Sequence, residues 1–282
     1  KEVSGGSGAN TIVGLASLGV PTCYIGKVSD DQLGNKFRID LNDMNVNYDT
    51  TFLETQGSAE TGRCIVFVTP DGERSMNTYL GVTEFLEATD IDPMKISQTE
   101  WLYLEGYRFD GQKSELAFAK AIDTAKSYGG RIALTLSDPF CIERNMQAFK
   151  NLISSGLDLL FCNELELKLL CNTKNLEIAA QYISKSVPLL ACTLGEEGVL
   201  VCDRGNITLV PTEKVEAVDT TGAGDLFAAG FLYGLIHKQG PEICGKMGNL
   251  AASEIISHLG ARPEINLGSL FKDKLPNFKS IG

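Results

Sequence analysis

The stretch Asp219-Thr220-Thr221-Gly222-Ala223-Gly224-Asp225 runs directly into the apolar segment 226–236. A helix N-terminus leaves amide N–H groups unpaired and carries a partial positive charge, so it attracts anions. Gly222 and Gly224 allow strained backbone angles and a close approach of a ligand, because they have no Cβ. The stretch therefore predicts an anion site at the start of a helix, with the Asp225 carboxylate just inside that helix.

The chemistry of this motif points to phosphoryl transfer. The amides of Gly222, Ala223 and Gly224 can converge on negative charge while Asp225 points at the same place. An anion hole beside a carboxylate base is what phosphoryl transfer to an alcohol requires. An ordinary glycine-rich turn with an acid in the first helical turn has the same pattern. The motif alone therefore does not distinguish a phosphoryl-transfer site from such a turn, and other parts of the sequence are needed.

Composition limits the class of partner. The 282 residues include 25 Lys and Arg and 36 Asp and Glu, which gives a formal net charge of −11. Nucleic-acid binding requires a basic face, so we expect no nucleic-acid partner. An anionic substrate would need help from backbone dipoles, a few basic side chains or a metal ion. The length suits one large α/β domain or two smaller ones.

The cysteines and histidines do not form a metal-binding pattern. Eight cysteines are scattered without a C-x-x-C pair, and only two histidines, His237 and His258, are present. We therefore expect no zinc site. Cys162 and Cys192 lie in apolar runs, which is typical of buried thiols in a reducing compartment, so we expect a cytoplasmic protein. No apolar run is as long as a membrane span and no signal peptide is visible, so we expect no membrane partner.

From residue 100 onward, predicted strands alternate with predicted helices, which indicates a parallel sheet covered on both faces. The predicted strands are Thr22 to Val28, Trp101 to Glu105, Arg131 to Leu136, Leu157 to Cys162, Val187 to Leu194, Gly198 to Cys202 and Ile207 to Pro211. The predicted helices are Asn10 to Leu18, Asp31 to Met44, Lys113 to Lys126, Arg144 to Ile153, Glu164 to Leu170, Leu176 to Ser184, Leu226 to Lys238 and Ile243 to His258. The segment 271–282 is weakly patterned, and we expect it to be loosely attached. Ligands of such sheets bind beyond the carboxyl ends of the strands.

The segment 46–81 has a different pattern. Three strand-like runs, 46–53, 62–69 and 74–79, follow one another without a helix between them. The turn signal Pro70-Asp71-Gly72-Glu73 predicts that the last two form an antiparallel hairpin. We expect a small separate β element over 46–81 that acts as a lid, with the core formed by 1–45 and 82–282. An edge extension of the main sheet is the alternative.

Three further motifs contain candidate binding residues. Gly5-Gly6-Ser7-Gly8-Ala9-Asn10 resembles a linker, but it runs into a helix, where its amides and Asn10 can bind a polar ligand such as a diol. It lacks the third glycine of a dinucleotide fingerprint, which weakens a dehydrogenase interpretation. Asn163 and Glu166 are three residues apart on one helical turn, where they either form an N-cap or order magnesium-bound water.

The third of these motifs, Thr193-Leu194-Gly195-Glu196-Glu197-Gly198, lies between two apolar strands. Its glycines allow a nucleotide phosphate to approach the backbone, although a plain hairpin turn has the same composition. The chain contains no G-x-x-x-x-G-K-[ST] motif, which excludes a P-loop enzyme at this level. It also contains no G-x-S-x-G motif and no Ser/His/Asp set, and we expect His237 and His258 to be surface or packing residues.

These motifs resemble, in order, those of the ribokinase-like (PfkB) family of sugar and nucleoside kinases over essentially the whole chain. The resemblance also includes Gly26 to Gly34. The phrases Thr135 to Phe140 and Ser257 to Pro263 are most similar to the adenosine-kinase-like branch. The resemblance implies an α/β ribokinase-like fold, with a mostly parallel central sheet, helices on both faces and a small β-sheet lid.

The resemblance also implies roles for individual residues. Asp225 would take the proton of the acceptor hydroxyl, and Gly222, Ala223 and Gly224 would form the anion hole. Glu166 would hold Mg²⁺ through water. The acceptor hydroxyls would be bound by Gly5, Gly6 and Asn10. The nucleotide would be bound by Asn163, Thr193, Gly195, Gly198 and Asn249.

The function that follows is an ATP-dependent kinase of a small nucleoside or sugar, with adenosine as the first acceptor. A ribokinase- or fructokinase-type sugar kinase is the second hypothesis, and a catalytically inactive binding protein of the same fold is the third. Arg63 and Arg108 could clamp an anionic acceptor, but we expect both to face solvent.

Three expectations concern features outside these motifs. Relatives imply a monovalent cation such as K⁺ beside the anion hole. Family members usually carry an acceptor-binding Asp on a first strand, which we expect to be missing here. A monomer and a homodimer joined through lid edges both fit the sequence.

Overall fold

The computed structural model describes residues 2–48, 59–69, 74–110 and 113–276. Its centre is a six-stranded sheet with the strand order β10-β9-β8-β7-β6-β5. Strands β5 to β8 run parallel to one another, whereas β9 and β10 are antiparallel to their neighbours. The strands are β5 (Trp101–Glu105), β6 (Arg131–Thr135), β7 (Leu159–Asn163), β8 (Leu189–Thr193), β9 (Val199–Asp203) and β10 (Asn206–Val210). The predicted mostly parallel α/β sheet is therefore confirmed.

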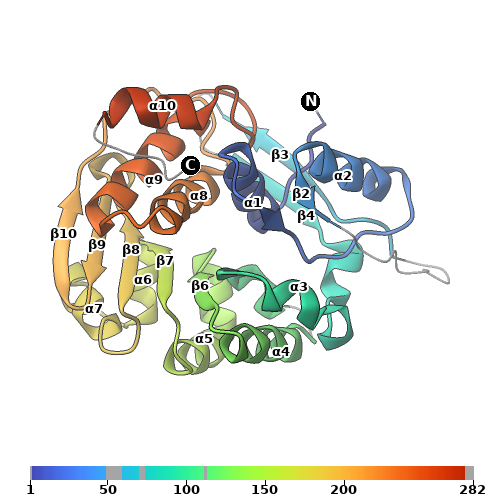
Figure 1. Cartoon of the computed structure of the whole chain (residues 1–282), viewed down its shortest axis with the longest axis horizontal. Helices are drawn as coiled ribbons and strands as arrows, with labels where there is room; N and C mark the ends of the chain where they lie inside the picture. Colours follow the sequence, from blue (N-terminus) through green and yellow to red (C-terminus); the bar gives the residue numbers. More distant parts are fainter. Residues whose placement is uncertain (1, 49–58, 70–73, 111–112, 277–282) are drawn as a thin grey trace.

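Helices cover both faces of this sheet because its strands are apolar on both sides. In β7, Leu160 and Cys162 join one buried cluster, whereas Leu159 and Phe161 join the other. The first face packs against α3 (Pro93–Ser97), α4 (Ser114–Ser127), α5 (Pro139–Ser154), α6 (Glu164–Leu170) and α7 (Leu176–Ile183). The second packs against α1 (Ser7–Ser17), α8 (Ala223–Ile236), α9 (Pro241–Ile255) and α10 (Leu267–Lys274), as Figure 1 shows.

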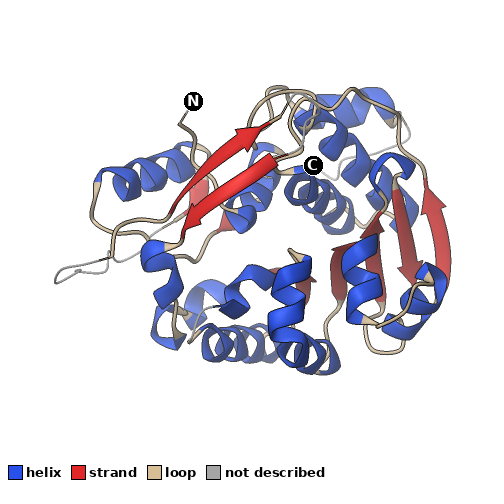
Figure 2. Cartoon of the chain, turned by 180° about the vertical axis from the view of Figure 1, so that it is seen from behind, coloured by secondary structure: helices blue, strands red, loops and turns tan. Residues whose placement is uncertain are grey.

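Two small sheets lie apart from the central one. Strands β3 (Arg63–Val68) and β4 (Arg74–Tyr79) form an antiparallel pair, which confirms the predicted hairpin (Figure 2). Strands β1 (Thr22–Cys23) and β2 (Val46–Asn47) pair in parallel, and α2 (Gln32–Asp43) connects them. Of the strand predicted over 46–53, residues 46 and 47 therefore pair with β1 and not with the hairpin. Residues 49–53 of that prediction and its turn at 70–73 lie outside the described residues.

Several predicted boundaries are wrong for identifiable reasons. The first helix begins at Ser7 rather than Asn10, because Gly6 at φ 98° provides its N-cap. The strand predicted over 22–28 ends at Cys23, since β2 offers only two paired residues in the described part. Helix α5 begins five residues early, at Pro139, where the Asp138 side chain accepts the amides of residues 140 and 141.

The C-terminal prediction also needs correction. Helix α10 covers residues 267–274, and its N-cap Asn266 accepts the Ser269 amide. Leu267 and Phe271 are fully buried against α8 and α9, so this part of the chain is attached rather than loose. Residues 277–282 lie outside the described residues.

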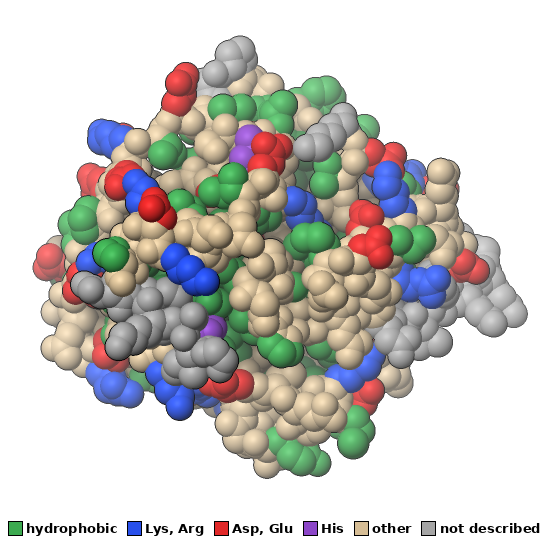
Figure 3. Space-filling view, turned by 45° about the horizontal axis from the view of Figure 1, so that its top comes forward, with side chains coloured by type: hydrophobic (Ala, Val, Ile, Leu, Met, Phe, Trp, Pro, Cys, Tyr) green, Lys and Arg blue, Asp and Glu red, His purple; other side chains and the backbone are tan. Residues whose placement is uncertain are grey.

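The surface shows no single-sign region on the face drawn in Figure 3, where acidic and basic side chains are interspersed. Within the described residues, no helix combines the length and the apolar character needed to cross a membrane. All eight cysteines are free thiols. Cys162 and Cys192 are buried as predicted, whereas Cys64 on the hairpin is exposed.

Candidate active site

The N-terminus of α8 forms the first part of the site. Its N-cap is Gly222 in the left-handed conformation at φ 85°, and Asp225 lies in the first turn. A Cβ on Gly222 would lie 2.9 Å from that of Ala261, so the position requires glycine for space as well as for conformation. A Cβ on Gly224 would meet no atom within 4 Å, so Gly224 borders open space.

The three amides predicted for the anion hole are not equivalent. The Ala223 amide donates to Thr220 O across the turn at 3.3 Å, so the turn already uses that donor. Gly224 is exposed beside Asp225. A helix end leaves its first amides without intrahelical acceptors, which keeps this position suited to an anion.

Helix α1 holds the Asp225 carboxylate. Ser7 Oγ donates to Asp225 Oδ1 at 2.7 Å, and Asn10 Nδ2 donates to Oδ2 at 2.8 Å. The Asn10 amide predicted to bind the acceptor is therefore engaged with the predicted base. Its Oδ1 atom is buried and has no hydrogen-bond partner among the described residues, which leaves one acceptor group for a ligand hydroxyl. Sequence reasoning missed Ser7.

The glycines before α1 lie in the open. Gly5 and Gly6 are both exposed, and a Cβ on Gly5 would meet no atom within 4 Å. They precede Ser7 directly, so they border the space beside Asp225. Their position fits the predicted contact with an acceptor, because the backbone there is accessible.

Glu105 is a site residue that sequence reasoning missed. It ends β5, and a Cβ on Gly8 of α1 would lie 2.7 Å from its Oε2 atom. Burial, and next the charge of Asp225, raise the pKa of Glu105 to about 7. The signal in the sequence was an acid at the carboxyl end of a strand in a parallel sheet, where ligands bind.

A cavity of about 160 Å³ opens between α1, β1 and β5. Its lining is mostly apolar and aromatic, and the polar groups that face it include Lys27, Glu105 and Arg108. Arg108 is half-buried with a buried Nε atom that has no partner among the described residues, so the expectation that it faces solvent is wrong. Arg63 is exposed as expected; it pairs with Glu60.

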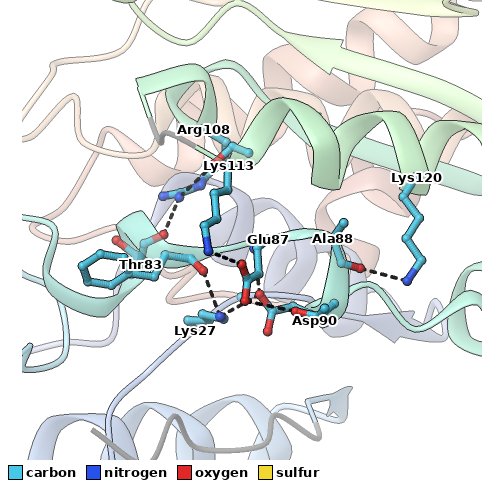
Figure 4. A network of polar contacts seen from close by, with 12 residues as sticks. Lys27, Thr83, Glu87, Ala88, Asp90, Arg108, Lys113 and Lys120 are labelled. Atoms are coloured by element: carbon cyan, nitrogen blue, oxygen red, sulfur yellow. Dashed lines mark hydrogen bonds and ion pairs between the residues drawn. The ribbon is translucent and has the colours of Figure 1, made fainter. Parts of the chain in front are cut away.

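A polar network fixes one wall of this cavity (Figure 4). Lys27 is buried, and its Nζ atom donates to Phe85 O and pairs with Asp90, each at 2.8 Å. Arg108 donates to Thr83 O, and Lys113 pairs with Glu87 at 2.6 Å. The two 3₁₀ turns in this network, Gly81–Phe85 and Ala88–Asp90, follow β4, so the network ties the end of the hairpin to the core.

The predicted nucleotide residues form two groups. Asn163 and Thr193 are register partners at the ends of β7 and β8. Asn163 also caps α6: its Oδ1 accepts the Glu166 amide at 2.8 Å, and its own amide donates to Glu166 Oε2 at 3.0 Å. The predicted pair is therefore a capping box.

The second group meets at the end of β10. Gly195 and Gly198 have φ values of 60° and 98°, and a Cβ on Gly198 would lie 2.2 Å from Val210 O. Asn249 Nδ2 donates to Val210 O at 3.0 Å and to Pro211 O at 3.3 Å. Asn249 therefore stabilises the backbone at the end of β10 and the start of the following loop. Its side-chain NH₂ group is already used by these two carbonyl oxygens.

Glu166 and Asp138 offer oxygen ligands of the kind that Mg²⁺ prefers. Burial raises the pKa of Glu166 to about 7. The hydrogen bond from the Asn163 amide lowers this pKa, and the charge of Asp138 raises it by a smaller amount. Both Glu166 oxygens accept hydrogen bonds from Asn163, so contact through a metal-bound water fits better than direct ligation. Among the described residues, no group of three or more Asp, Glu, His or Cys side chains could hold a metal alone.

Tyr107 follows β5 and lies near the acidic groups of the site. Partial burial and then the charges of Asp138, Asp225, Glu166 and Glu105 raise the pKa of its phenol. The phenol therefore lies within electrostatic reach of all four carboxylates. The carboxyl ends of β5, β6 and β7 lie at one edge of the sheet because these strands are parallel, and α1 contacts both Glu105 at the end of β5 and Asp225 of α8 there, as expected for a sheet of this type.

Comparison with known proteins agrees with this geometry. The chain is 40% identical to an adenosine kinase from Sinorhizobium meliloti, with a TM-score of 0.94 over 97% of this chain and 84% of that one. It is 38% identical to a probable sugar kinase from Rhizobium etli, with a TM-score of 0.92 over 96% and 82%. A fructokinase from Escherichia coli is 30% identical over 82% of this chain and 76% of its own length. Residues 1–266 match the pfkB family carbohydrate kinases, and the chain belongs to this family.

Proposed function

We propose that the protein transfers the γ-phosphoryl group of ATP to a hydroxymethyl group of a nucleoside or sugar. The observation that supports this best is the position of Asp225. Its carboxylate lies one turn inside the glycine-capped N-terminus of α8 and is oriented by Ser7 and Asn10. A base beside a helix N-terminus serves phosphoryl transfer to an alcohol, because one accepts a proton while the other stabilises negative charge.

In this mechanism, Asp225 accepts the hydroxyl proton as the bond to phosphorus forms. The transition state is loose and the hydroxyl becomes acidic late, so a carboxylate is a sufficient base. At the N-terminus of α8, the exposed Gly224 amide and the Gly222 amide beside it would stabilise charge on the transferred group, whereas the Ala223 amide already donates to Thr220 O. Glu105 ends β5 close to Gly8 and is placed to bind an acceptor hydroxyl.

The nucleotide would lie along the ends of β7 and β8, near Asn163 and Thr193, with Gly195, Gly198 and the loop supported by Asn249 beside it. Mg²⁺ would be held through water by Glu166 and Asp138. When bound, it neutralises charge on the phosphates. A monovalent cation such as K⁺ beside the anion hole is proposed from the family resemblance alone.

Adenosine is the first acceptor we propose, and ribose or fructose the second. The mostly apolar and aromatic lining of the cavity between α1 and β5 suits a purine, whereas Glu105 in this lining and the unpaired Asn10 oxygen beside Asp225 suit sugar hydroxyls. The similarity to an adenosine kinase at 40% identity supports the same choice. The third hypothesis is a catalytically inactive binding protein of this fold.

The experiment is an ADP-release assay with Mg²⁺ and ATP against adenosine, other nucleosides, ribose and fructose. Turnover with adenosine above the sugars supports the first hypothesis, and the reverse order supports the second. Binding of an acceptor without ADP release would support the third hypothesis, a catalytically inactive binding protein. Comparing neutral with phosphorylated sugars in the same assay tests whether Arg108 selects an anionic acceptor.

We also propose that residues 46–81 act as a lid on a core of 1–45 and 82–282. Lid closure would exclude water, which otherwise competes as a phosphoryl acceptor. Ile65 and Phe67 on β3 are 61% and 60% exposed, so a monomer with an open lid and a lid-mediated homodimer are both compatible with this surface. The eight free thiols support a cytoplasmic location.

A further inference from the structure

The loop of residues 256–265 follows α9 and contacts two parts of the site, the segment that leads into α8 and the start of α1. We propose that Glu254 is a positioning residue that fixes this loop, and that the loop in turn sets the position of the α8 N-terminus relative to α1. The proposal rests on the proposed function, because it assigns Glu254 a role in aligning that active site.

Glu254 lies in the last turn of α9, and it is only 8% exposed. Its Oε1 atom accepts the amides of Glu264 at 2.9 Å and Ile265 at 3.3 Å, and His258 Nε2 lies 3.1 Å away. Its Oε2 atom is buried without a hydrogen-bond partner among the described residues. One oxygen therefore contacts the loop at residue 258 and again at its end, at residues 264 and 265.

The loop holds the segment that leads into α8. The Val218 amide donates to Ile256 O at 2.7 Å, and the Gly260 amide donates to Asp219 Oδ2 at 3.0 Å. The other oxygen of Asp219 accepts the Thr221 amide at 2.9 Å. This buried carboxylate thus joins the loop to the turn just before the proposed anion hole, and Ala261 packs against Gly222 within that turn.

The same loop holds the start of α1. Arg262 donates from Nη1 to Ala9 O at 3.2 Å and from Nη2 to Ser4 O at 3.3 Å. Ala9 lies between Ser7 and Asn10, the two residues that orient Asp225. The loop therefore contacts both the helix that carries the proposed base and the helix that orients it.

Movement of this loop would separate two groups that must be aligned for catalysis. A displacement of about 1 Å at a reacting centre can lower turnover by about 10²-fold, even when its cause is remote. Neither Glu254 nor its hydrogen-bond partners line the proposed binding positions for ATP or the acceptor. Loss of Glu254 is therefore expected to lower kcat more than it raises either KM.

The test compares Glu254→Ala with Glu254→Gln and with Glu242→Ala, an exposed acid on the same helix that pairs with Lys246. Glu254→Ala should lower kcat by about 10- to 100-fold with both KM values within about threefold. Glu254→Gln keeps an oxygen acceptor, and Oε2 has no partner to lose, so it should restore most of the turnover. Glu242→Ala should behave as the wild type.

Hydrogen exchange at residues 217–224, measured by mass spectrometry, gives a second measurement that does not depend on turnover. Exchange should be faster in Glu254→Ala and unchanged in Glu242→Ala. If Glu254→Ala does not fold, His258→Ala removes one donor and should shift both measurements in the same direction by less.

Unchanged kcat and exchange in Glu254→Ala, or in His258→Ala where that variant replaces it, would overturn the proposal. So would a Glu254→Gln variant as impaired as Glu254→Ala. A wild-type chain that releases no ADP with any of the acceptors contradicts the proposed function instead, and hydrogen exchange still decides the role of Glu254.

Discussion

Asn10 and Asp225 are 215 positions apart in the sequence, yet Asn10 Nδ2 donates to Asp225 Oδ2 at 2.8 Å. This hydrogen bond joins the first turn of α8 to α1. The motif predicts that Asn10 binds the acceptor substrate, whereas in the structure its side-chain amide donates to the proposed base. The remaining Asn10 oxygen is buried without a partner in the described part of the chain.

Asp225→Asn should lower kcat by about 10²-fold or more while ATP binding stays nearly unchanged. The variant is expected to fold, because Asn10 can turn its amide and accept from the new side-chain NH₂ group. ADP release gives kcat, and calorimetry gives ATP affinity. Unchanged turnover would remove Asp225 from the mechanism.

Asn10→Ala removes a charge-assisted hydrogen bond to Asp225 and a free acceptor. We expect kcat/KM for the acceptor to fall roughly 10-fold or more, since hydrogen bonds to charged groups contribute about 1.5–3 kcal/mol. Ser17→Ala is the control, because Ser17 is on the same helix and donates only to Gly14 O. Equal kinetics for the two variants would contradict a role for Asn10.

Gly222→Ala and Gly224→Ala separate folding from anion binding. At Gly222, a Cβ meets Ala261 and φ is 85°, so we expect a loss of about 1–3 kcal/mol of stability. At Gly224, a Cβ meets no atom within 4 Å, so stability should be unchanged while turnover falls because the Cβ enters the proposed phosphate position. Thermal unfolding and ADP release distinguish the two effects. A fully active Gly224→Ala protein would place the phosphate elsewhere.

Glu105 should make stability depend on pH. Burial and then Asp225 raise its pKa to about 7 in the folded protein, against an ordinary value of 4.5. Between these values the folded state binds more protons than the unfolded state, so stability falls as pH rises from about 4.5 to 7 and then levels off. Glu166 contributes with the same sign.

The Tm of Glu105→Gln should therefore decrease less between pH 5 and pH 8 than the Tm of the wild type. Glu115→Gln is the control, since Glu115 is exposed on α4. Parallel Tm curves for the wild type and Glu105→Gln would show that Glu105 titrates normally.

Glu166→Gln tests the proposed magnesium contact. The amide oxygen can keep accepting the Asn163 amide, so α6 should stay capped, but the charge that attracts Mg²⁺ is lost. Second-shell changes of this kind typically cost about 10- to 100-fold in metal affinity, so the Mg²⁺ concentration for half-maximal rate should rise to that extent. Glu164→Gln, in the same helical turn and paired with Lys168, is the control. An unchanged Mg²⁺ requirement would leave Glu166 as a helix cap alone.

The sequence by itself determined the class of sheet, the hairpin and the helix start at 222–225. Alternation of strands and helices, a turn signal and glycines before an apolar run are local features, and each reports backbone preference or burial within a few residues. For the same reason, the ends of short elements such as β1 were placed poorly, because their length depends on a partner strand.

Only the tertiary structure decided which side chains act together. Ser7, Glu105 and Arg262 each lie on a different element, and no local pattern relates them to Asp225. They meet because α1 packs beside α8 and the carboxyl end of β5 faces both. Packing brings together residues hundreds of positions apart, and its geometry follows from the fit of whole elements in the core rather than from any short stretch of sequence.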